Sequence, residues 1–258
     1  MVPLSALLPL LADVNNVMHP ALGMREPVAG LTHMIAAVIA LYATSILWDR
    51  SRGDRPKQWS MAIYGLSLVV LYCASAAYHI AEVSPEALVL YRKIDHCAIF
   101  ALIAGTYTPF CFNAWSGRWR VLSLATIWGI ALAGIALKSL WIDISDGVSA
   151  SMYIVMGWLA VLGYAKLAAV ITHRGMLWAG VGGVIYSAGA TIDVVGWPWS
   201  VPGVFAGHEV FHLSVMLASA VHFAVVLRYV VPIARPRFFE SPADAEAAAA
   251  AEGEPTAS

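Results

Sequence analysis

Long apolar stretches separated by short polar connections make up most of this chain. A helix needs about 20 mostly apolar residues to cross a bilayer, and seven stretches meet that requirement. They cover residues 28–48, 59–80, 94–112, 121–140, 152–171, 176–195 and 208–230. The connections between them carry most of the charges, glycines and prolines. This pattern predicts an all-α, polytopic membrane protein folded as a seven-transmembrane helix bundle.

The same pattern divides the chain into three parts. Residues 25–231 form the predicted bundle, and residues 1–24 are expected to lie at the membrane interface or to be disordered. Residues 232–258 become rich in Ala, Glu and Pro, which predicts a disordered C-terminal tail. Lys and Arg are more frequent on the membrane side that holds the C-terminal flank. The positive-inside rule therefore predicts a cytoplasmic C-terminus and an external N-terminus.

Composition excludes an ordinary soluble domain. The 258 residues are 60% hydrophobic and 12% charged, whereas soluble domains carry about 25% charged residues. The net charge of −1 gives no basis for nucleic-acid binding. Cys73, Cys97 and Cys111 all lie in apolar segments without a C-x-x-C pairing. They predict neither a disulfide framework nor a cysteine-based metal site.

Polar residues inside the apolar stretches are the candidates for function, because such residues are costly within a bilayer. His208 and His212 begin the last stretch and lie four residues apart, so they share one helix face. His79 ends the second stretch, and Asp95 begins the third. With seven spans, these three helix ends meet at the same side of the membrane. The four side chains are therefore expected at similar depth.

Three neutral imidazoles beside a carboxylate suit zinc, which takes three protein ligands and a water at catalytic sites. The predicted ligands are His79, His208 and His212. Asp95 is expected to orient the water or to accept its proton. Ser75, one helical turn before His79, can donate a hydrogen bond to a substrate or to Asp95. A purely structural role for these residues is the alternative, and three histidines at one depth weigh against it.

The string from His208 to His212 also matches H-E-x-x-H, the metalloprotease motif in which the Glu is the general base. That motif needs a third ligand further along the chain. His222 follows His212 by ten residues, about 15 Å along a helix, so it lies too far away to serve. The protease interpretation is therefore the weaker one, and Glu209 is not a predicted catalytic residue.

Four other polar residues lie on the same side of the predicted bundle. For Glu26 and His33, at the start of the first stretch, two interpretations stay open: groups beside the metal site, or interfacial residues. Asp193, near the end of the sixth stretch, is expected to be solvated at the interface. His96 neighbours Asp95 in sequence but points about 100° away around the helix, which favours packing or a supporting role.

Four motifs in the predicted helices resemble those of the haemolysin III family. They are Ser75-x-x-x-His79, Asp95-His96, Gly105-Thr106-Tyr107-Thr108-Pro109 and His208-x-x-x-His212. The resemblance covers roughly residues 25–230. That family is the bacterial branch related to the progestin and adiponectin receptors, in a superfamily that includes alkaline ceramidases. Two positions depart from the expected pattern: Ala29 and Gly30 stand where an Asn-like residue is usual, and Asp193 stands where an aromatic is usual.

The resemblance implies a zinc ion held by His79, His208 and His212, with Asp95 near the water and Ser75 alongside. It further implies a multi-pass protein of the bacterial plasma membrane with a site that cleaves a lipid amide such as ceramide. The family's name reflects a haemolytic, pore-forming activity attributed to some members. Three functions thus remain open from the sequence: a zinc-dependent lipid amide hydrolase, a pore-forming haemolytic protein with structural zinc, and a lipid-sensing receptor.

Overall fold

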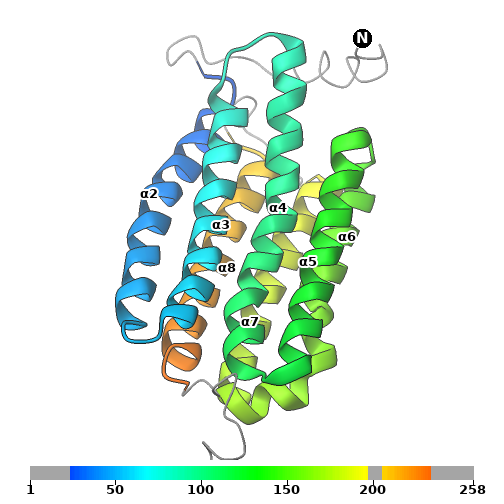
Figure 1. The fold of residues 1–258 in the computed structure, drawn as a ribbon. Coiled ribbons are helices and arrows are strands. Elements are labelled where there is room, and N and C mark those ends of the chain that lie inside the picture. Colours follow the sequence, from blue (N-terminus) through cyan, green and yellow to red (C-terminus); the bar gives the residue numbers. More distant parts are fainter. Residues whose placement is uncertain (1–23, 197–204, 234–258) are drawn as a thin grey trace, which may run out of the picture.

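The computed structural model of the chain describes residues 24–196 and 205–233, and these residues form a bundle of helices. The helices are α2 (Pro27–Arg50), α3 (Arg55–Ile80), α4 (Pro85–Ala114), α5 (Gly117–Leu140), α6 (Asp146–Trp158), the 3₁₀ turn η1 (Leu159–Gly163), α7 (Tyr164–Val195), α8 (Gly207–Val225) and the π-helical turn η2 (Val226–Val230). Figure 1 shows them side by side. The all-α prediction is confirmed. The predictions for residues 1–23 and for the tail beyond residue 233 lie outside the described residues.

Five helical stretches in the described part are long and apolar enough to cross a membrane. They are Pro27–Arg50, Arg55–Ile80, Gly117–Leu140, Asp146–Val195 and Gly207–Val230. This number is smaller than the seven spans predicted, and one stretch is much longer than a span requires. Asp146–Val195 has 50 residues. A straight helix of that length would measure about 75 Å, against a hydrocarbon core of about 30 Å.

Thr172 interrupts this long stretch. Its backbone angles (φ 70°, ψ 159°) are not helical, and a positive φ is unusual for a β-branched residue. In Figure 1, α7 begins in light green at the lower edge and ends in yellow near the upper edge. The connection predicted between residues 171 and 176 is therefore present, as a kink inside one helical segment.

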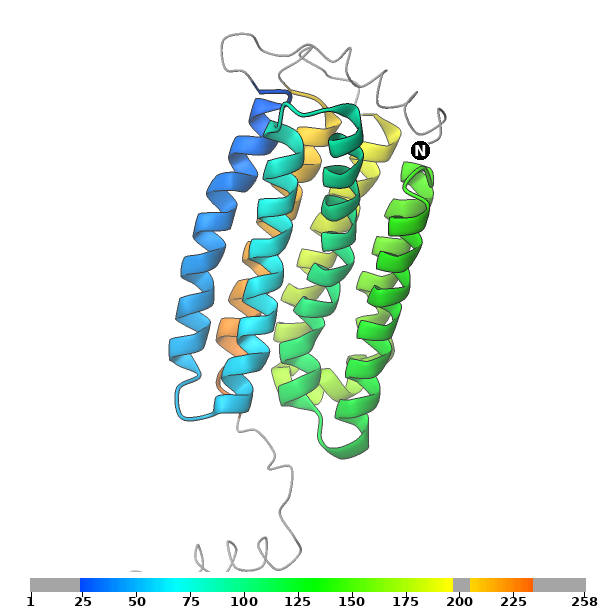
Figure 2. The same cartoon turned by 45° about the horizontal axis from the view of Figure 1, so that its top comes forward.

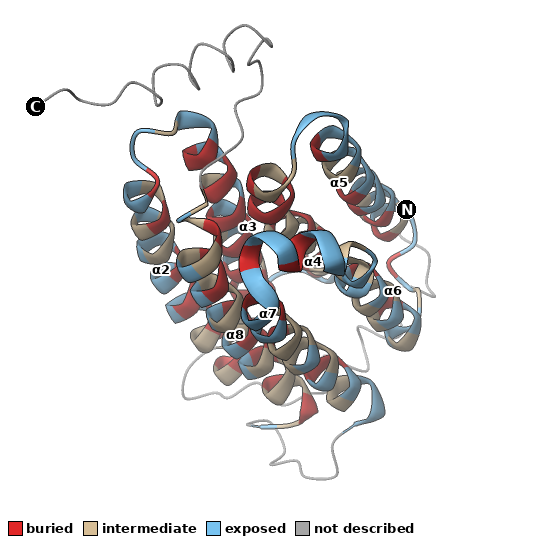
Figure 3. Ribbon diagram, turned by 90° about the horizontal axis from the view of Figure 1, so that it is seen from below, coloured by how far each residue is buried: buried red, intermediate tan, exposed pale blue. Residues whose placement is uncertain are grey.

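α4 is the central helix, since it packs against α3, α5, α6 and α7. α2 packs against α3 and α8, and α7 packs against α8, which completes the bundle (Figure 2). Apolar side chains such as Val38 and Leu41 of α2 are 65% and 57% exposed. The view along the helices in Figure 3 shows exposed positions on the outer faces of α2, α5 and α6. An apolar outer surface is what contact with lipid requires.

Two glycines allow close helix contacts near the ends that carry the histidines. A Cβ atom on Gly30 would lie 2.4 Å from Cγ1 of Ile80, so α2 runs very close to the end of α3. A Cβ atom on Gly189 would lie 2.5 Å from the Cβ of Ser214, so α7 runs equally close to α8. Small residues permit such contacts between membrane helices. Both contacts bring acidic residues up to the histidines.

Candidate metal centre

Three histidine rings meet where α3 ends and α8 begins. Nε2 of His208 lies 3.3 Å from Nε2 of His79 and 3.0 Å from Nε2 of His212. One nitrogen from each ring lies within 4.8 Å of the other two, a spacing that could hold a metal ion. His79 and His212 are almost fully buried, and His208 is partly exposed. The structure therefore brings the three predicted ligand histidines together.

Carboxylates contact two of these rings at Nδ1, the nitrogen that is not part of the Nε2 cluster. Nδ1 of His79 contacts Oε2 of Glu26, and Nδ1 of His208 lies 3.1 Å from Oδ1 of Asp193. Metal-binding histidines commonly donate their second ring N–H to a carboxylate, which fixes the tautomer and the ring orientation. Glu26 is itself held in place, because its backbone N–H donates to the carbonyl of His79 over 3.0 Å.

Glu26 lies just before α2 and is an ionised acceptor for His79. Burial raises the pKa of its carboxyl group, but the hydrogen bond from His79 and nearby positive charge, including that of Arg25, outweigh this effect and lower the pKa to about 2. The Glu26 carboxylate is therefore charged at neutral pH and accepts the proton on Nδ1 of His79. This leaves the lone pair of Nε2 directed toward the other two histidines.

The same assignment holds for His208, whose Nδ1–H faces Asp193. A neutral imidazole with a proton on Nδ1 presents a lone pair at Nε2. The Nε2 atoms of His79 and His208 lie 3.3 Å apart, so two unprotonated nitrogens there would repel each other unless one of them carried a proton. A proton shared with His212 can match one of these lone pairs. A metal cation among the three nitrogens attracts all of them.

Asp193 was expected in interfacial water, and the structure corrects this expectation. Its side chain is only 29% exposed and is directed at His208. Glu26, whose role the sequence left open, lies beside the cluster as well. The signal available in the sequence was the position of both acids at the ends of apolar stretches on the histidine side of the bundle. Which histidine ring each acid contacts depends on how the helices are rotated about their axes, and the positions of the acids in the sequence do not give that rotation.

A cavity of about 190 Å³ begins beside the histidines, and its wall includes His208, His212, Asp95 and Ser75. Asp95 and Ser75 are 8% and 2% exposed, and the carboxyl of Asp95 interacts with the hydroxyl of Ser75. His96 also lines the cavity, on the side of α4. The predicted catalytic pair therefore shares one chamber with two of the three predicted ligands.

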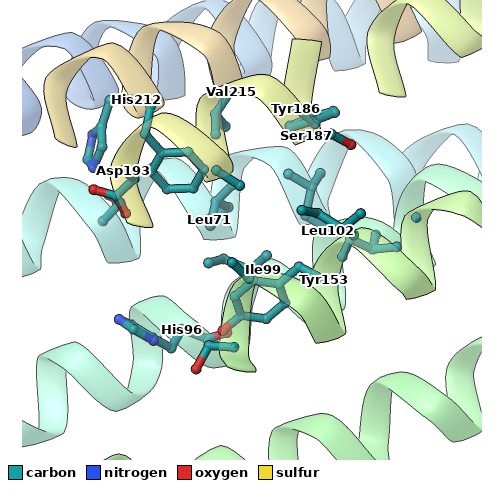
Figure 4. Close-up of a pocket in the computed structure, with 18 of the residues that line it drawn as sticks. Leu71, His96, Ile99, Leu102, Tyr153, Tyr186, Ser187, Asp193, His212 and Val215 are labelled. Atoms are coloured by element: carbon teal, nitrogen blue, oxygen red, sulfur yellow. The ribbon is translucent and has the colours of Figure 1, made fainter. Parts of the chain in front are cut away.

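Away from the histidines the cavity is mainly apolar. Figure 4 shows His212 and Asp193 at one end, Leu71 and Val215 further along, and Leu102 beyond them. The wall continues along α6, α7 and α8 to aromatic residues. The cavity thus has a polar end at the histidines and a mainly apolar remainder.

Glu209 has a structural role at the start of α8. Its Oε2 accepts a hydrogen bond from the backbone N–H of Ala206 over 2.6 Å, and the residue is 7% exposed. This contact satisfies one of the free N–H groups that precede a helix. His222 donates from Nε2 to the carbonyl of Ala179 on α7 and is not part of the cluster. Glu209 and His222, the residues that a protease motif would use as general base and third ligand, thus make other contacts.

Comparison with known proteins assigns the chain to a family. The family model described as "Haemolysin-III related" matches residues 23–223. Hemolysin-3 of Bacillus cereus is 34% identical over 214 residues, which cover 82% of this chain and 94% of that protein. The chain belongs to the haemolysin III family. The resemblance predicted from the four motifs is therefore confirmed.

Other relatives extend the haemolysin III match beyond one species. The Hemolysin-3 homolog of Bacillus subtilis is 31% identical over 213 residues, covering 81% of this chain and 97% of that protein. The human Monocyte to macrophage differentiation factor is 25% identical over 211 residues, covering 77% of this chain and 81% of that protein. All these matches span most of the helical bundle. The chain is thus a haemolysin III family membrane protein whose three clustered histidines could hold a metal ion.

An Asp193→Asn variant of this haemolysin III protein is expected to bind metal about 10- to 100-fold more weakly than the wild type. Asn preserves the size of the side chain but removes the negative charge that holds Nδ1 of His208. Competition with a chelator of known affinity measures the change. Thr191→Ala is the matched control, because Thr191 is exposed on the same helix and its hydroxyl bonds only within α7. Equal affinities in Asp193→Asn and the wild type would remove Asp193 from the site.

Proposed function

We propose that this haemolysin III protein is an integral membrane hydrolase that uses zinc to cleave a lipid amide such as ceramide. His79, His208 and His212 are the proposed ligands. The observation that carries the proposal is the convergence of three Nε2 atoms while carboxylates hold two of the rings from behind. An apolar cavity that begins at this point supports a lipid as the substrate.

The donor set fits zinc. Zinc binds imidazole nitrogen at about 2.0–2.1 Å in tetrahedral geometry, which places two such nitrogens about 3.3 Å apart. The two Nε2–Nε2 separations in the structure are 3.3 and 3.0 Å. Three neutral histidines also leave one of the four tetrahedral positions for a water or a substrate. Zinc bound there would act as a Lewis acid and lower the pKa of a water to about 7.

Asp95 is the proposed general base. Water adds to the carbonyl carbon of the amide as the Asp95 carboxylate accepts its proton. The proton then passes to the amide nitrogen as the C–N bond breaks, which yields a carboxylic acid and an amine. The Ser75 hydroxyl interacts with Asp95 and can orient the carboxylate or donate to the substrate carbonyl. Both residues are buried, so the chamber keeps bulk water away from these groups.

We also propose seven membrane spans with the C-terminus in the cytoplasm of a bacterial cell. The kink at Thr172 supports two spans within Asp146–Val195, and α4 supplies a further span at the centre of the bundle. The excess of Lys and Arg on the C-terminal side supports the orientation. Cysteine labelling of the connection at residues 51–54 and of the connection at residues 81–84 distinguishes the two sides.

Purified wild-type protein is expected to carry one zinc per chain and to release fatty acid from a long-chain ceramide. Removal of zinc with a chelator should stop the release, and added zinc should restore it. Elemental analysis measures the metal, and mass spectrometry of the lipid products measures the cleavage. Wild-type protein purified without chelators that lacks any metal would contradict the metal centre. Bound zinc without cleavage of any lipid amide would contradict the hydrolase and leave a binding or structural site.

The second candidate is a membrane-damaging protein in which zinc is structural. The 34% identity to a protein named Hemolysin-3 favours it. Leakage of a dye from liposomes that contain the protein is the relevant measurement. Under this alternative, leakage persists in an Asp95→Ala variant, whereas the proposed hydrolase loses its activity in the same variant.

A further inference from the structure

His33 of α2 is a buried histidine that lies against the metal centre without belonging to it. It is 3% exposed, and neither ring nitrogen has a hydrogen-bond partner in the described part of the chain. Its ring stacks on the ring of His212, with centroids 4.0 Å apart and planes at 22°. The edge of Tyr72 contacts the same ring from α3, with centroids 5.0 Å apart. An apolar side chain would fill this place at lower cost unless the ring has a function.

The three clustered histidines differ in how they are held. His79 has Glu26 at Nδ1 and His208 has Asp193 at Nδ1. Nδ1 of His212 is buried and faces the backbone of Ala29, and no carboxylate contacts it among the described residues. Two rings are therefore oriented by carboxylates, and the third is without this support. The stacked ring of His33 is the contact that distinguishes His212 from the other two.

The ring face of His33, and not its nitrogens, is what reaches the site. Both nitrogens are enclosed by protein, so they are not exposed to a ligand in the cavity. The group of nitrogens that could hold a metal comprises His79, His208 and His212, and His33 is not included. Aromatic stacking orients rings. An imidazole that binds a cation becomes electron-poor, which strengthens its attraction to the electron-rich face of a neutral neighbour.

We propose that His33 is a positioning residue that orients His212 for metal binding through ring stacking, in place of a carboxylate. Tyr72 in turn holds His33 through its edge contact. The chain thus uses two kinds of support around one centre: charged acceptors behind His79 and His208, and a stacked ring beside His212. This inference rests on the proposed function only in that the three histidines bind a metal; it does not require that the protein cleaves a lipid.

His33→Leu and His33→Phe provide the test, because both fill the space and only Phe retains a ring that can stack. Cobalt(II) is the probe, since it replaces zinc and its visible absorption reports the arrangement of the ligands. His33→Leu is expected to bind cobalt about 10- to 100-fold more weakly than the wild type, the range found for other supporting groups. Its absorption spectrum is expected to change. His33→Phe is expected to retain both the affinity and the spectrum of the wild type.

Thermal unfolding of the metal-free proteins shows whether the variants fold, and Tyr72→Leu gives a second measurement that leaves His33 intact. Weaker cobalt binding in Tyr72→Leu than in Tyr72→Phe supports the proposal even if His33→Leu does not fold. Wild-type cobalt affinity in His33→Leu would overturn the proposal. Equal losses of cobalt affinity in His33→Leu and His33→Phe would also overturn it, because the ring nitrogens of His33, and not its stacking, would then support the site. Wild-type protein that binds no metal would overturn the metal centre itself, a result distinct from both.

Discussion

A His208→Ala variant is expected to purify without stoichiometric metal. Among the three clustered rings, His208 is the one whose Nε2 lies within 3.3 Å of the corresponding atoms of both others. Its loss leaves two ligands on separate helices and leaves Asp193 without its imidazole partner. Elemental analysis of protein purified in detergent measures the metal content. Near-stoichiometric metal in this variant would contradict the proposed ligand set.

The stability of the same variant provides an independent measurement. Without metal, the removal of His208 leaves the Asp193 carboxylate without its ring partner, so the metal-free variant is expected to be no more stable than the metal-free wild type. With metal, only the wild type gains stability, by about 4 kcal/mol when free metal exceeds the dissociation constant a thousandfold. Thermal unfolding with and without zinc measures both effects.

Two controls on the same helix separate loss of the ligand from damage to α8. Glu209→Gln removes a charge next to His208 but retains a side chain that can cap the helix. Glu209→Gln is expected to keep the metal. In a protease-type site, where Glu209 would be the general base, the same change would abolish the activity. His222→Ala removes an imidazole that bonds to Ala179. It is also expected to keep the metal, because His222 is not part of the cluster.

The helical bundle could be predicted from the sequence because hydropathy reports which segments leave water. The predicted stretches at 28–48 and 121–140 agree with α2 and α5 within a few residues. The kink at Thr172 was marked by the polar residues that follow it. Hydropathy gives less information on helix rotation, because lipid outside and apolar neighbours inside favour the same residue types. The apolar outer face of α2 illustrates this limit.

The histidine cluster could be predicted because depth follows from topology alone. Helix ends on one side of a bundle lie at one level; His79 lies at one such end, and His208 and His212 lie at another. Which side chain lies behind each ring depends on helix rotation and on close contacts such as those at Gly30 and Gly189. Asp193 was therefore assigned to water, and the stacking of His33 on His212 was not predicted.

The supports around the cluster explain why a bilayer-spanning protein can keep three neutral imidazoles together. Each of the two carboxylates contributes negative charge close to the cluster without occupying the point at which the Nε2 atoms meet. Arg25 forms an ion pair with Glu26, so a divalent cation with the two carboxylates and Arg25 would form a group of small positive net charge. Low net charge reduces the cost of burying the cation. Glu26 and Asp193 thus orient the rings and balance the charge.

An Asp95→Asn variant is expected to retain stoichiometric metal and to lose about 10²- to 10⁴-fold in the rate of lipid amide cleavage, the range for a removed general base. Asn has nearly the same shape and can still interact with the Ser75 hydroxyl, but it cannot accept a proton from water. Metal analysis and the release of fatty acid from ceramide are measured on the same preparation.

Ser75→Ala is the matched control for Asp95→Asn, because it changes the neighbour of Asp95 and leaves the carboxylate in place. It is expected to cause a smaller loss of rate and no loss of metal. If Asp95→Asn lost the metal, Asp95 would be a ligand and not a base. If it kept the full rate, the proton would be accepted elsewhere in the chamber, and His96, on the same cavity wall, would be the next residue to replace.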